Sequence, residues 1–475
     1  MRNEIPSPSK RPTISRRRFV RHLAAGAIVT PLSTIVPRTT LAAPGRPGAN
    51  DRIDVALFGM GTRGKQIVDN LPEIGHIVAV ADPDLKKAES NTREKSGKWA
   101  VYDDVRRLLD KEKIDGVVCC NTDHNHIHTA ILACRAGADL YVEKPFCHTV
   151  AEGRILVELA KKHRCILQAG TQSRSIPLNQ LLLGGIRDGR YGKLRAVICR
   201  AHRISSPAPR LPAEPLPDGL NWDAWLGPAV QRSYAEEFIK RWLRYRDFGQ
   251  WTNGGWGAHA YDMIQNALGA EDTGPIAIWP TSKKSHFGEQ PGELNTKLRM
   301  KYASGHEIRL ELDRGVGPDV GAIFVCEHAK IEINRNTFKS NPPDLIKKLP
   351  PDPDAKEEVT WPARLGWMGR CHLRNWLECI KSRRRPNAYG ELAQRAGTLC
   401  CLTTIARLVN RPLEWDPKSE RFVGDDEANA LLNPPRRKGH ELPIVAGSGR
   451  STEIECRDPR VSCNRPGLFR HLGLS

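Results

Sequence analysis

The chain has 475 residues, which is enough for two domains with large cores, and 39% of them are hydrophobic. Of its net charge of +19, residues 1–46 carry +8 and residues 436–475 carry +4, which leaves +7 for the residues between them. A nucleic-acid-binding protein would gather its basic residues on one face of the fold, so this distribution argues against that class.

The N-terminal segment resembles a twin-arginine export signal. Ser15–Arg21 reads SRRRFVR, a short and interrupted apolar stretch follows over residues 23–36, and residues 40–42 suit signal-peptidase cleavage. We therefore expect a signal peptide and linker over residues 1–46, export by the twin-arginine machinery, and a periplasmic or cell-envelope location. A disordered basic arm is the alternative. No later stretch is long and apolar enough to span a bilayer, so we expect no stable membrane insertion.

The first strong structural signal is a strand followed by a glycine-rich turn. Ile53–Phe58 is an apolar run typical of a buried parallel strand, and GMGTRG follows it before a helix expected over Lys65–Asn70. In this GxGxxG pattern, Gly59 permits the tight turn, Gly61 leaves room for a pyrophosphate, and Gly64 lets the helix and the strand pack closely. The helix N-terminus would offer unpaired N–H groups to the phosphates.

An acidic residue completes this dinucleotide-binding pattern. Asp82 ends the next apolar run and stands 18 residues after Gly64, close to the ~20 residues expected for the acid that binds the ribose hydroxyls. Because a carboxylate repels a 2′-phosphate, the pattern favours NAD over NADP. The alternative is an ordinary strand–turn–helix in another doubly wound protein. The residues expected at the cofactor are Gly59, Gly61, Thr62, Arg63, Gly64 and Asp82.

Helices and strands continue to alternate after Asp82. The sequence predicts helices over Lys86–Lys95, Tyr102–Asp110 and Ile127–Ala136 and strands over Ile114–Cys120 and Leu140–Val142. This alternation predicts an α/β fold with a doubly wound Rossmann domain over residues 50–169. The turn at Asn121–His126 and the Glu143-Lys144-Pro145 segment both follow strands, at the edge where such sheets hold their ligands.

Lys144 is a candidate catalytic residue on chemical grounds. Pro145 disfavours a helical conformation at Lys144, which stiffens the chain just after the strand. A lysine at the mouth of a nucleotide site, near a positive nicotinamide ring, would have a lowered pKa. Such an amine is suited to accept a proton from a substrate hydroxyl. The alternative is a surface lysine that pairs with Glu143.

The second half of the chain has a different pattern. Short alternating runs predict an α+β domain over residues 170–365 with an open, largely antiparallel sheet, and the proline-rich loop Ile204–Leu220 is expected over the cleft. Two amphipathic helices, Leu373–Lys381 and Leu392–Val409, are expected to pack back on the first domain within residues 366–442. Residues 443–475 lack periodicity and are predicted to be disordered.

A helix near the middle of the chain carries a second catalytic candidate. Residues 251–264 read WTNGGWGAHAYDMI, in which His259 and Asp262 share a helix face by their i, i+3 spacing. A histidine oriented by a carboxylate is a plausible general acid or base. Tyr261, Asp262 and Gln172 are the candidate substrate-binding residues. The alternative for His259 is a structural histidine at a helix start.

Neither the histidines nor the cysteines predict a metal site. His124, His126 and His128 are spaced so that only pairs would point alike on a turn or strand, and no cysteine or acid completes a ligand set. The 13 cysteines form no CxxC ladder. Cys119-Cys120 and Cys400-Cys401 stand in apolar segments, so we expect buried, mostly reduced thiols.

Together these motifs resemble the Gfo/Idh/MocA family of glucose-fructose oxidoreductase and inositol dehydrogenase. The matching segments are GMGTRG, NTDHNHIHTAILACRAGADLYVEKPFCHT, Gly170-Thr171-Gln172 and WDAWLGP at residues 222–228, and the resemblance covers roughly residues 50–442. The family's usual turn is TPDxxH, so Asn121-Thr122 departs from the expected Thr-Pro. That departure affects only the backbone shape expected beside the nicotinamide.

The resemblance implies particular roles at the cofactor and at the substrate. It places Asn121, Thr122, His126, Glu143 and Lys144 beside the cofactor. It also matches His259 to the family's catalytic histidine. Many members carry an aspartate four residues before that histidine, where this chain has Gly255. Without that aspartate, proton transfer must rely on Lys144 and His259.

The function implied is an NAD-dependent oxidoreductase acting on a secondary hydroxyl of a sugar, cyclitol or sugar derivative, in a homo-oligomer. Two alternative functions are compatible with the same residues. One is a glycosidase that uses NAD catalytically through transient sugar oxidation and elimination. The other is a non-catalytic sugar or nucleotide binder. Four tryptophans either stack on a sugar ring or pack in the core: Trp222, Trp225, Trp251 and Trp256.

Overall fold

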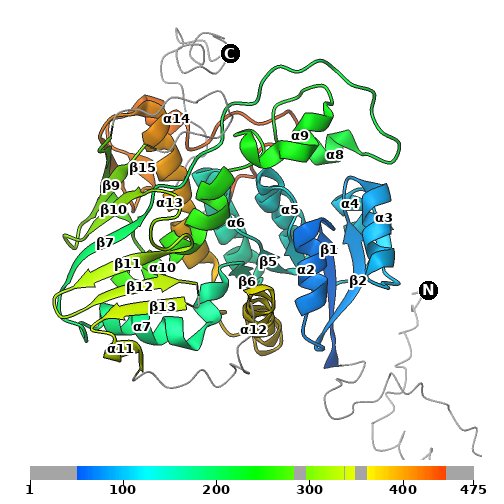
Figure 1. The fold of residues 1–475 in the computed structure, drawn as a ribbon. Helices are drawn as coiled ribbons and strands as arrows, with labels where there is room; N and C mark the ends of the chain where they lie inside the picture. Colours follow the sequence, from blue (N-terminus) through cyan, green and yellow to red (C-terminus); the bar gives the residue numbers. More distant parts are fainter. Residues whose placement is uncertain (1–50, 283–295, 336, 348–360, 446–475) are drawn as a thin grey trace, which may run out of the picture. The chain divides into compact units, whose positions relative to one another are not determined.

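The computed structural model describes residues 51–282, 296–335, 337–347 and 361–445 (Figure 1). The expected signal peptide lies outside the described residues, as does the expected disordered tail from residue 446 onward. Two sheets organise the residues from Arg52 onward, one in each half of the chain.

The N-terminal sheet has six parallel strands in the order β3-β2-β1-β4-β5-β6. The strands are β1 (Ile53–Phe58), β2 (Gly75–Ala81), β3 (Ala100–Tyr102), β4 (Gly116–Cys119), β5 (Asp139–Val142) and β6 (Leu167–Ala169). The strand order reverses between β1 and β4. Their carboxyl ends therefore open a crevice of the kind in which doubly wound sheets bind ligands, and the predicted Rossmann fold is confirmed.

The helices of this half are α2 (Thr62–Asn70), α3 (Leu85–Glu94), α4 (Val105–Lys111), α5 (Asp123–Arg135) and α6 (Val150–His163). Two predicted elements differ from these. Tyr102 ends the short strand β3, so the helix expected from Tyr102 begins only at Val105. The polar run Asp123–His126 is the first turn of α5, because an acid in a first turn complements the helix dipole and Thr122 keeps the extended backbone of an N-cap.

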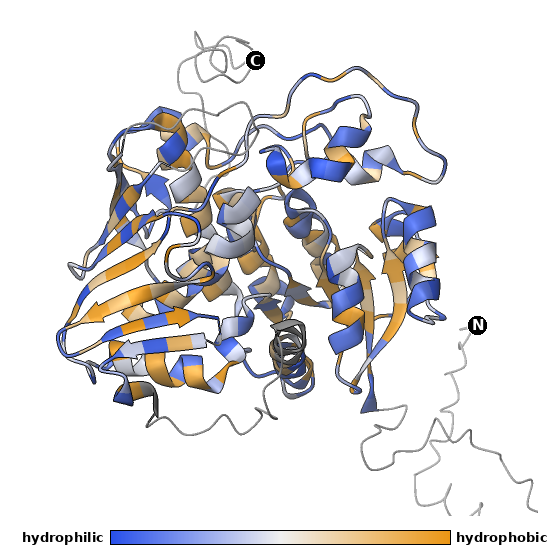
Figure 2. Ribbon diagram, in the orientation of Figure 1, coloured by the Kyte–Doolittle hydropathy of each residue, from blue (hydrophilic) through white to orange (hydrophobic). Residues whose placement is uncertain are grey.

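Apolar side chains cover both faces of the parallel sheet. Figure 2 shows β1 and β2 as mostly hydrophobic strands beside the hydrophilic helices α3 and α4. On one face, helix α12 (Trp361–Ser382) adds Leu373, Trp376 and Leu377 to the cluster formed by Val55 and Tyr141. Helix α12 therefore packs against the parallel sheet of the first domain.

The second sheet has nine strands in the order β13-β12-β11-β7-β10-β9-β8-β14-β15. Neighbouring strands are antiparallel except β7 and β10, so the predicted open, largely antiparallel sheet is confirmed. The strands are β7 (Leu194–Arg200), β8 (Pro275–Pro280), β9 (Leu298–Tyr302), β10 (Glu307–Leu312), β11 (Gly321–Cys326), β12 (Lys330–Asn334), β13 (Thr337–Asn341), β14 (Leu413–Asp416) and β15 (Arg421–Phe422).

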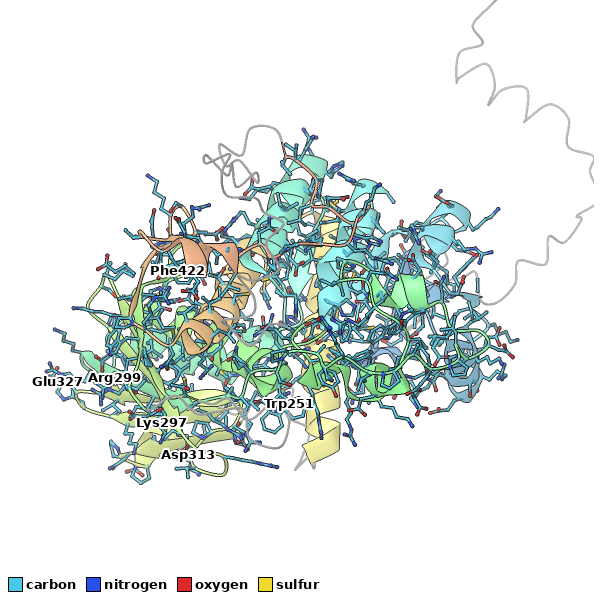
Figure 3. All side chains as sticks on the ribbon, turned by 90° about the horizontal axis from the view of Figure 1, so that it is seen from above. Trp251, Lys297, Arg299, Asp313, Glu327 and Phe422 are labelled. Carbon is cyan, nitrogen blue, oxygen red and sulfur yellow. The ribbon has the colours of Figure 1, made fainter. Side chains whose placement is uncertain are left out.

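One face of the second sheet is packed and the other carries charged pairs. Helices α7 (Pro177–Arg187), α10 (Ala258–Leu268) and α13 (Gly390–Val409) share the core of the packed face with residues such as Met300 and Ile308. On the opposite side of β9 and β10, Arg299 lies 3.3 Å from Glu307, and Lys297 just before β9 lies 3.2 Å from Asp313 (Figure 3). Alternation of apolar and charged residues along these strands produces the two faces.

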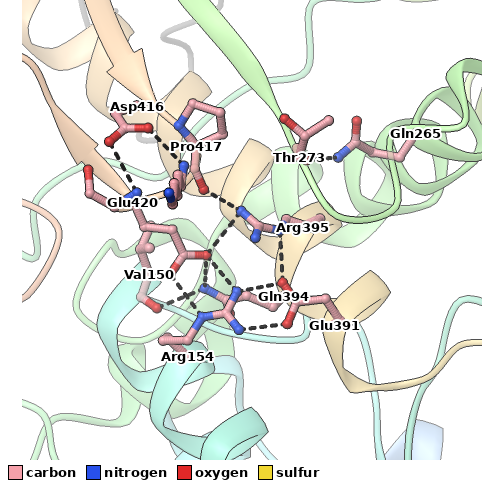
Figure 4. A network of polar contacts seen from close by, with 12 residues as sticks. Val150, Arg154, Gln265, Thr273, Glu391, Gln394, Arg395, Asp416, Pro417 and Glu420 are labelled. Atoms are coloured by element: carbon pink, nitrogen blue, oxygen red, sulfur yellow. Dashed lines mark hydrogen bonds and ion pairs between the residues drawn. The ribbon is translucent and has the colours of Figure 1, made fainter. Parts of the chain in front are cut away.

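A partly buried ionic cluster ties α6 to α13 and to the β14–β15 hairpin (Figure 4). The Arg154 guanidinium donates to Glu391 at 2.6 Å and to Glu420 at 2.8 Å, and Arg395 donates to Glu391 at 2.9 Å. Burial alone would raise the pKa of Glu391, but Arg154 outweighs it and holds that pKa at about 2. The cluster therefore fixes the C-terminal helix against the Rossmann half by charge as well as by packing.

The remaining short elements connect the two sheets or cap them. They are η2 (Gln172–Ser175), α8 (Trp222–Leu226), α9 (Glu236–Arg241), η3 (Trp242–Arg244), the π-turn η4 (Asn253–Gly257), α11 (Asp344–Lys347) and α14 (Asp426–Ala430). Of these, α8 to η4 belong to the segment that follows the proline-rich loop and borders the crevice of the parallel sheet.

Candidate active site

The glycine-rich turn has the three properties that its spacing predicts. Gly59 has a φ of +100°, and a Cβ there would lie 2.7 Å from the Asn121 nitrogen, so only glycine fits between β1 and β4. A Cβ at Gly64 would lie 2.3 Å from the Gly59 carbonyl oxygen. A Cβ at Gly61 would meet nothing within 4 Å. Gly61 therefore leaves open space at the N-terminus of α2, which is where a diphosphate would bind.

Asp82 is held beside this turn. Its carboxylate accepts the Met60 N–H at 2.8 Å and the Asp84 N–H at 3.0 Å. Burial raises the pKa of Asp82, and these two hydrogen bonds and the charge of Lys87 oppose that rise. The carboxylate is thus positioned at the carboxyl end of β2, as the ribose-binding acid of a dinucleotide site is.

His126 links the chain segments that follow β4 and β5. Its ring nitrogens lie 2.9 Å from the Pro145 carbonyl oxygen and 3.1 Å from the Asn121 carbonyl oxygen. Burial lowers the pKa of His126, and its contact with the Pro145 carbonyl oxygen opposes this shift. The Asn121 side chain donates to Thr129 at 3.1 Å. These contacts fix the two strand ends that border the crevice.

Glu143 forms an ion pair with Arg63 of the glycine-rich turn, and from Lys144 it accepts only the backbone N–H, at 3.2 Å. Its side chain is 3% exposed and accepts hydrogen bonds from the Arg63 guanidinium at 2.8 and 2.6 Å and from Gln172 at 3.2 Å. Burial alone would raise the pKa of Glu143, but the charges of Arg63 and Lys144 outweigh it and lower that pKa. Arg63 therefore joins α2 to the end of β5.

The Lys144 amine has no hydrogen bond to any residue that the structure describes. Burial lowers the pKa of Lys144, although the charge of Glu143 opposes this shift. The residue lines the crevice together with the glycine-rich turn. The surface-lysine alternative does not fit these observations, because Glu143 is occupied by Arg63.

These residues border one cavity of about 700 Å³, which we call the switch-point cavity because it lies where the strand order reverses. A cavity of this size at this edge is a default ligand site. The predicted cofactor residues on its wall are Gly59, Gly61, Thr62, Arg63, Asp82, Asn121, Thr122, His126, Glu143 and Lys144; Gly64 lies behind it, packed on Gly59.

His259 lies close to this cavity but is not on its wall. The side chain is 2% exposed, and its Nδ1 has no hydrogen-bond partner among the described residues. Burial lowers the pKa of His259 well below its usual value, and the charges of Arg335 and Lys144 lower it further. Gly255 is on the cavity wall, and a Cβ there would meet nothing within 4 Å. The position of the family aspartate is therefore open space.

The three predicted substrate-binding side chains have other partners. Asp262 does not orient His259: its carboxylate accepts from the Arg174 guanidinium at 2.9 and 3.0 Å. The Tyr261 hydroxyl donates to the Asn253 side chain at 2.8 Å, inside the core. Gln172 is 6% exposed and donates to Glu143. None of the three is on the wall of the switch-point cavity, so we leave them out of the site.

Aromatic side chains form the far wall of the cavity. Trp225, Trp251 and Trp256 all line it, and Trp222 stacks on Trp225 with ring centroids 4.8 Å apart. Sequence reasoning missed His440, which also lines the cavity and lies 4.8 Å from the His128 ring. Lys87, Asp123 and Arg106 were missed as well. Their only signal in the sequence was nearness to the ends of β2, β3 and β4.

The histidine-rich start of α5 is spread over different contacts. His124 contacts the carbonyl oxygens of Phe248 and Trp225 at 3.1 and 3.0 Å, while His126 and His128 have the partners given above. In the part of the chain that the structure describes, no group of three His, Cys, Asp or Glu side chains is arranged to hold a metal ion. Among the same residues, no helix combines the length and apolar character needed to cross a bilayer.

A glycine-rich turn, a ribose-side acid and a crevice at the strand-order reversal define the class of NAD-binding Rossmann proteins. Family models agree in both halves: residues 53–171 match the oxidoreductase-family NAD-binding Rossmann fold, and residues 206–442 match the C-terminal α/β domain of the same family. The chain therefore belongs to the Gfo/Idh/MocA oxidoreductase family, and its N-terminal half is the NAD-binding Rossmann domain of that family.

Curated relatives match a limited part of the chain. A myo-inositol 2-dehydrogenase of Thermotoga maritima is 26% identical over 158 residues, which are 33% of this chain and 46% of that protein. A D-glucoside 3-dehydrogenase of Escherichia coli is 29% identical over 127 residues, or 27% of this chain and 36% of that protein. The matches thus span less than half the length of these relatives.

Solved structures share the fold over a larger part of the chain. The WlbA dehydrogenase of Bordetella pertussis, in complex with NADH and UDP-GlcNAcA, superposes with a TM-score of 0.56 at 13% identity, covering 77% of this chain and 99% of that one. A myo-inositol dehydrogenase of Lactobacillus casei, in complex with NAD(H) and myo-inositol, superposes with a TM-score of 0.52 at 16% identity, covering 77% of this chain and 97% of that one. At these identities the likeness concerns the fold alone.

Proposed function

We propose that this protein is an NAD-dependent dehydrogenase that moves a hydride between nicotinamide and a secondary hydroxyl carbon of a sugar, cyclitol or sugar derivative. One observation carries the proposal: the Lys144 amine, without a hydrogen bond to any described residue, lines the same cavity as the glycine-rich turn and Asp82. A proton acceptor and a dinucleotide site then share one space, which is what hydroxyl oxidation requires.

NAD, when bound, supplies the hydride acceptor. The open space at Gly61 and the N-terminus of α2 would receive its diphosphate, and the Asp82 carboxylate would bind the ribose hydroxyls. Lys144 Nζ would accept the proton of the substrate hydroxyl, because its lowered pKa increases the fraction of neutral amine. We assign His259 to exchange that proton with Lys144, since burial keeps its ring neutral.

The choice of NAD over NADP rests on Asp82, whose carboxylate would repel a 2′-phosphate. Lys87 lines the same end of the cavity and would weaken that discrimination. Separate titrations of the purified protein with NADH and NADPH test the choice. The proposal expects the tighter binding for NADH.

The experiment that tests the reaction is a substrate panel with NAD. The curated relatives suggest myo-inositol, scyllo-inositol and D-glucosides as first members, since these relatives are named for those compounds. We expect net formation of NADH with at least one sugar or cyclitol. No net NADH with any member, while NAD still binds, would overturn the proposed reaction.

We also propose export by the twin-arginine route to the periplasm or cell envelope, supported by the SRRRFVR segment. Replacing Arg16 and Arg17 with lysine is expected to leave the protein in the cytoplasmic fraction. A homo-oligomer is proposed as well, through the face of the nine-stranded sheet that the helices leave uncovered. Light scattering after size exclusion measures that mass directly.

A further inference from the structure

A second cavity, of about 720 Å³, also reaches the α5 N-terminus: His124 lines it, whereas Asp123 and Asn125 line the switch-point cavity. We call it the arginine cavity, after Arg210, Arg232, Arg246 and Arg436 on its wall. Pro207 and Ala208 of the proline-rich loop also line it, so that loop borders this cavity and not the switch-point cavity over which the sequence placed it.

The charges around the arginine cavity do not balance. Arg436 forms an ion pair with Glu152, and Arg232 forms one with Asp247. Arg246 makes no side-chain hydrogen bond within the described residues, and its Nη1 is buried without a partner. The charge of Asp247 also acts on Arg246, but that carboxylate is already held by Arg232. Arg210, which is exposed, also has no ion pair among the described residues, so two guanidinium charges remain uncompensated; of these two, only Arg246 has a buried nitrogen without a partner.

An uncompensated guanidinium is costly in this position. Burial lowers the pKa of Arg246, which shows that its charged form is disfavoured there. Native proteins pair their buried charges, because leaving one partner alone is strongly destabilising. A group that lies on a cavity wall can instead be compensated by an anion in the cavity, and a guanidinium matches a carboxylate with two parallel hydrogen bonds.

Other unpartnered polar atoms lie on the same wall. Gln250 is 6% exposed, and its Oε1 has no hydrogen-bond donor among the described residues. The Nδ1 of His148 and the Nε of Arg232 are also buried without partners. Buried polar atoms in native structures nearly always find a partner, so four such atoms in side chains of one cavity wall make this wall unusual. The rest of the wall is apolar and includes Ala208, Pro228, Ala229, Ile405, Leu408 and Leu431.

We propose that the arginine cavity is a second binding site, distinct from the switch-point cavity, for an organic carboxylate with an apolar body. Arg246 binds the carboxylate group, and the apolar residues contributed by the proline-rich loop and α13 enclose the body. Gln250 accepts a hydrogen bond from a hydroxyl group where the ligand carries one. This site makes no use of Lys144 or the glycine-rich turn, so it stands independently of the proposed dehydrogenase activity.

Calorimetric titration of the full-length protein with NAD present tests the proposal with three probes. Benzoate provides the carboxylate and an apolar body, benzamide is its neutral isostere, and inorganic phosphate provides an anion without the apolar body. We expect saturable binding of benzoate, at least about tenfold weaker binding of benzamide, and no measurable binding of phosphate in the same range. Phosphate binding as tight as that of benzoate, or no binding of benzoate, would overturn the proposal.

Variants then locate the site. Arg246→Gln is expected to weaken benzoate binding at least about tenfold, while the control Arg241→Gln, at an exposed arginine paired with Glu237, leaves it unchanged. Lys144→Met should also leave it unchanged, which separates this site from the switch-point cavity. Benzoate binding that survives Arg246→Gln, or that is lost with Lys144→Met, refutes the assignment.

Thermal unfolding without ligand keeps the proposal testable if Arg246→Gln alters folding. An arginine placed to bind a ligand is uncompensated in the free protein, so Arg246→Gln is expected to keep or raise the melting temperature. A structural arginine would lower it. Ala229→Phe offers a second route, because it fills the apolar part of the cavity and should abolish benzoate binding with Arg246 intact.

Discussion

Gly61→Ala separates the role of a glycine in ligand binding from its role in folding. The Gly61 backbone has a φ of −76° and a ψ of −160°, which alanine adopts without strain, and a Cβ there would meet nothing within 4 Å. Reducing the freedom of the unfolded chain favours alanine by about 0.4–1 kcal/mol, and losing glycine at an N-cap costs about the same. The free energy of unfolding should therefore change by less than about 1 kcal/mol.

NAD binding is expected to respond very differently to this substitution. The added methyl group would occupy the space that we assign to the diphosphate and push it away from the N–H groups of α2. Charge-assisted hydrogen bonds contribute about 1.5–3 kcal/mol each, so losing one or two weakens NAD binding by at least about tenfold. Urea unfolding and a fluorescence titration with NADH measure the two effects on the same preparation.

Two other glycines provide controls. Gly64→Ala places a Cβ 2.3 Å from the Gly59 carbonyl oxygen, so it should damage both stability and NAD binding. Gly184→Ala in α7, whose nearest atom is 3.7 Å away, should leave NAD binding unchanged and raise the free energy of unfolding by about 0.4–1 kcal/mol. If Gly61→Ala binds NADH as tightly as the unaltered protein, the assignment of this turn to the diphosphate is refuted.

Three further predictions concern the site and the fold. Gly255→Asp should fold, because the position is open, and a carboxylate there should raise the pKa of His259; an unchanged pH profile of turnover would contradict this. Glu391→Gln should lower the free energy of unfolding by about 1–3 kcal/mol at pH 7. Arg154 lowers the folded-state pKa of Glu391 to about 2, so this stabilisation is present above pH 4.5 and fades as the pH falls toward 2. Urea unfolding should therefore show a smaller difference in the free energy of unfolding between Glu391→Gln and the unaltered protein at pH 3 than at pH 7. An active substrate should yield one NADH per molecule oxidised, and release of a sugar substituent without net NADH would favour the glycosidase alternative.

The Rossmann half could be predicted because its signals are local. The spacing along the sequence predicts how three features are arranged: Ile53–Phe58, the glycine-rich turn and Asp82. The structure shows the arrangement that this spacing predicts. The strand β3 was missed because three residues, Ala100–Tyr102, are too few to show a period. The first turn of α5 was missed because its polar residues are equally typical of a loop.

The second half of the site depends on contacts between distant segments. The i, i+3 spacing of His259 and Asp262 was a sound reason to pair them, but Arg174, 88 residues earlier, holds the carboxylate. In the same way, the Glu143 side chain forms its ion pair with the distant Arg63 and not with the amine of its neighbour Lys144. His440, in the C-terminal segment, also lines the cavity. Tertiary partners of this kind leave no periodic trace in a single sequence.

The most direct test of the account is to remove the Lys144 amine while keeping the NAD site. Lys144→Met preserves the length of the side chain, and Lys162→Met, at an exposed lysine on α6, is the matched control. We expect Lys144→Met to bind NADH normally and to lose turnover by about 10²- to 10⁴-fold, with the control unaffected. Turnover that persists in Lys144→Met at the rate of the control would contradict the central claim that this amine handles the substrate proton.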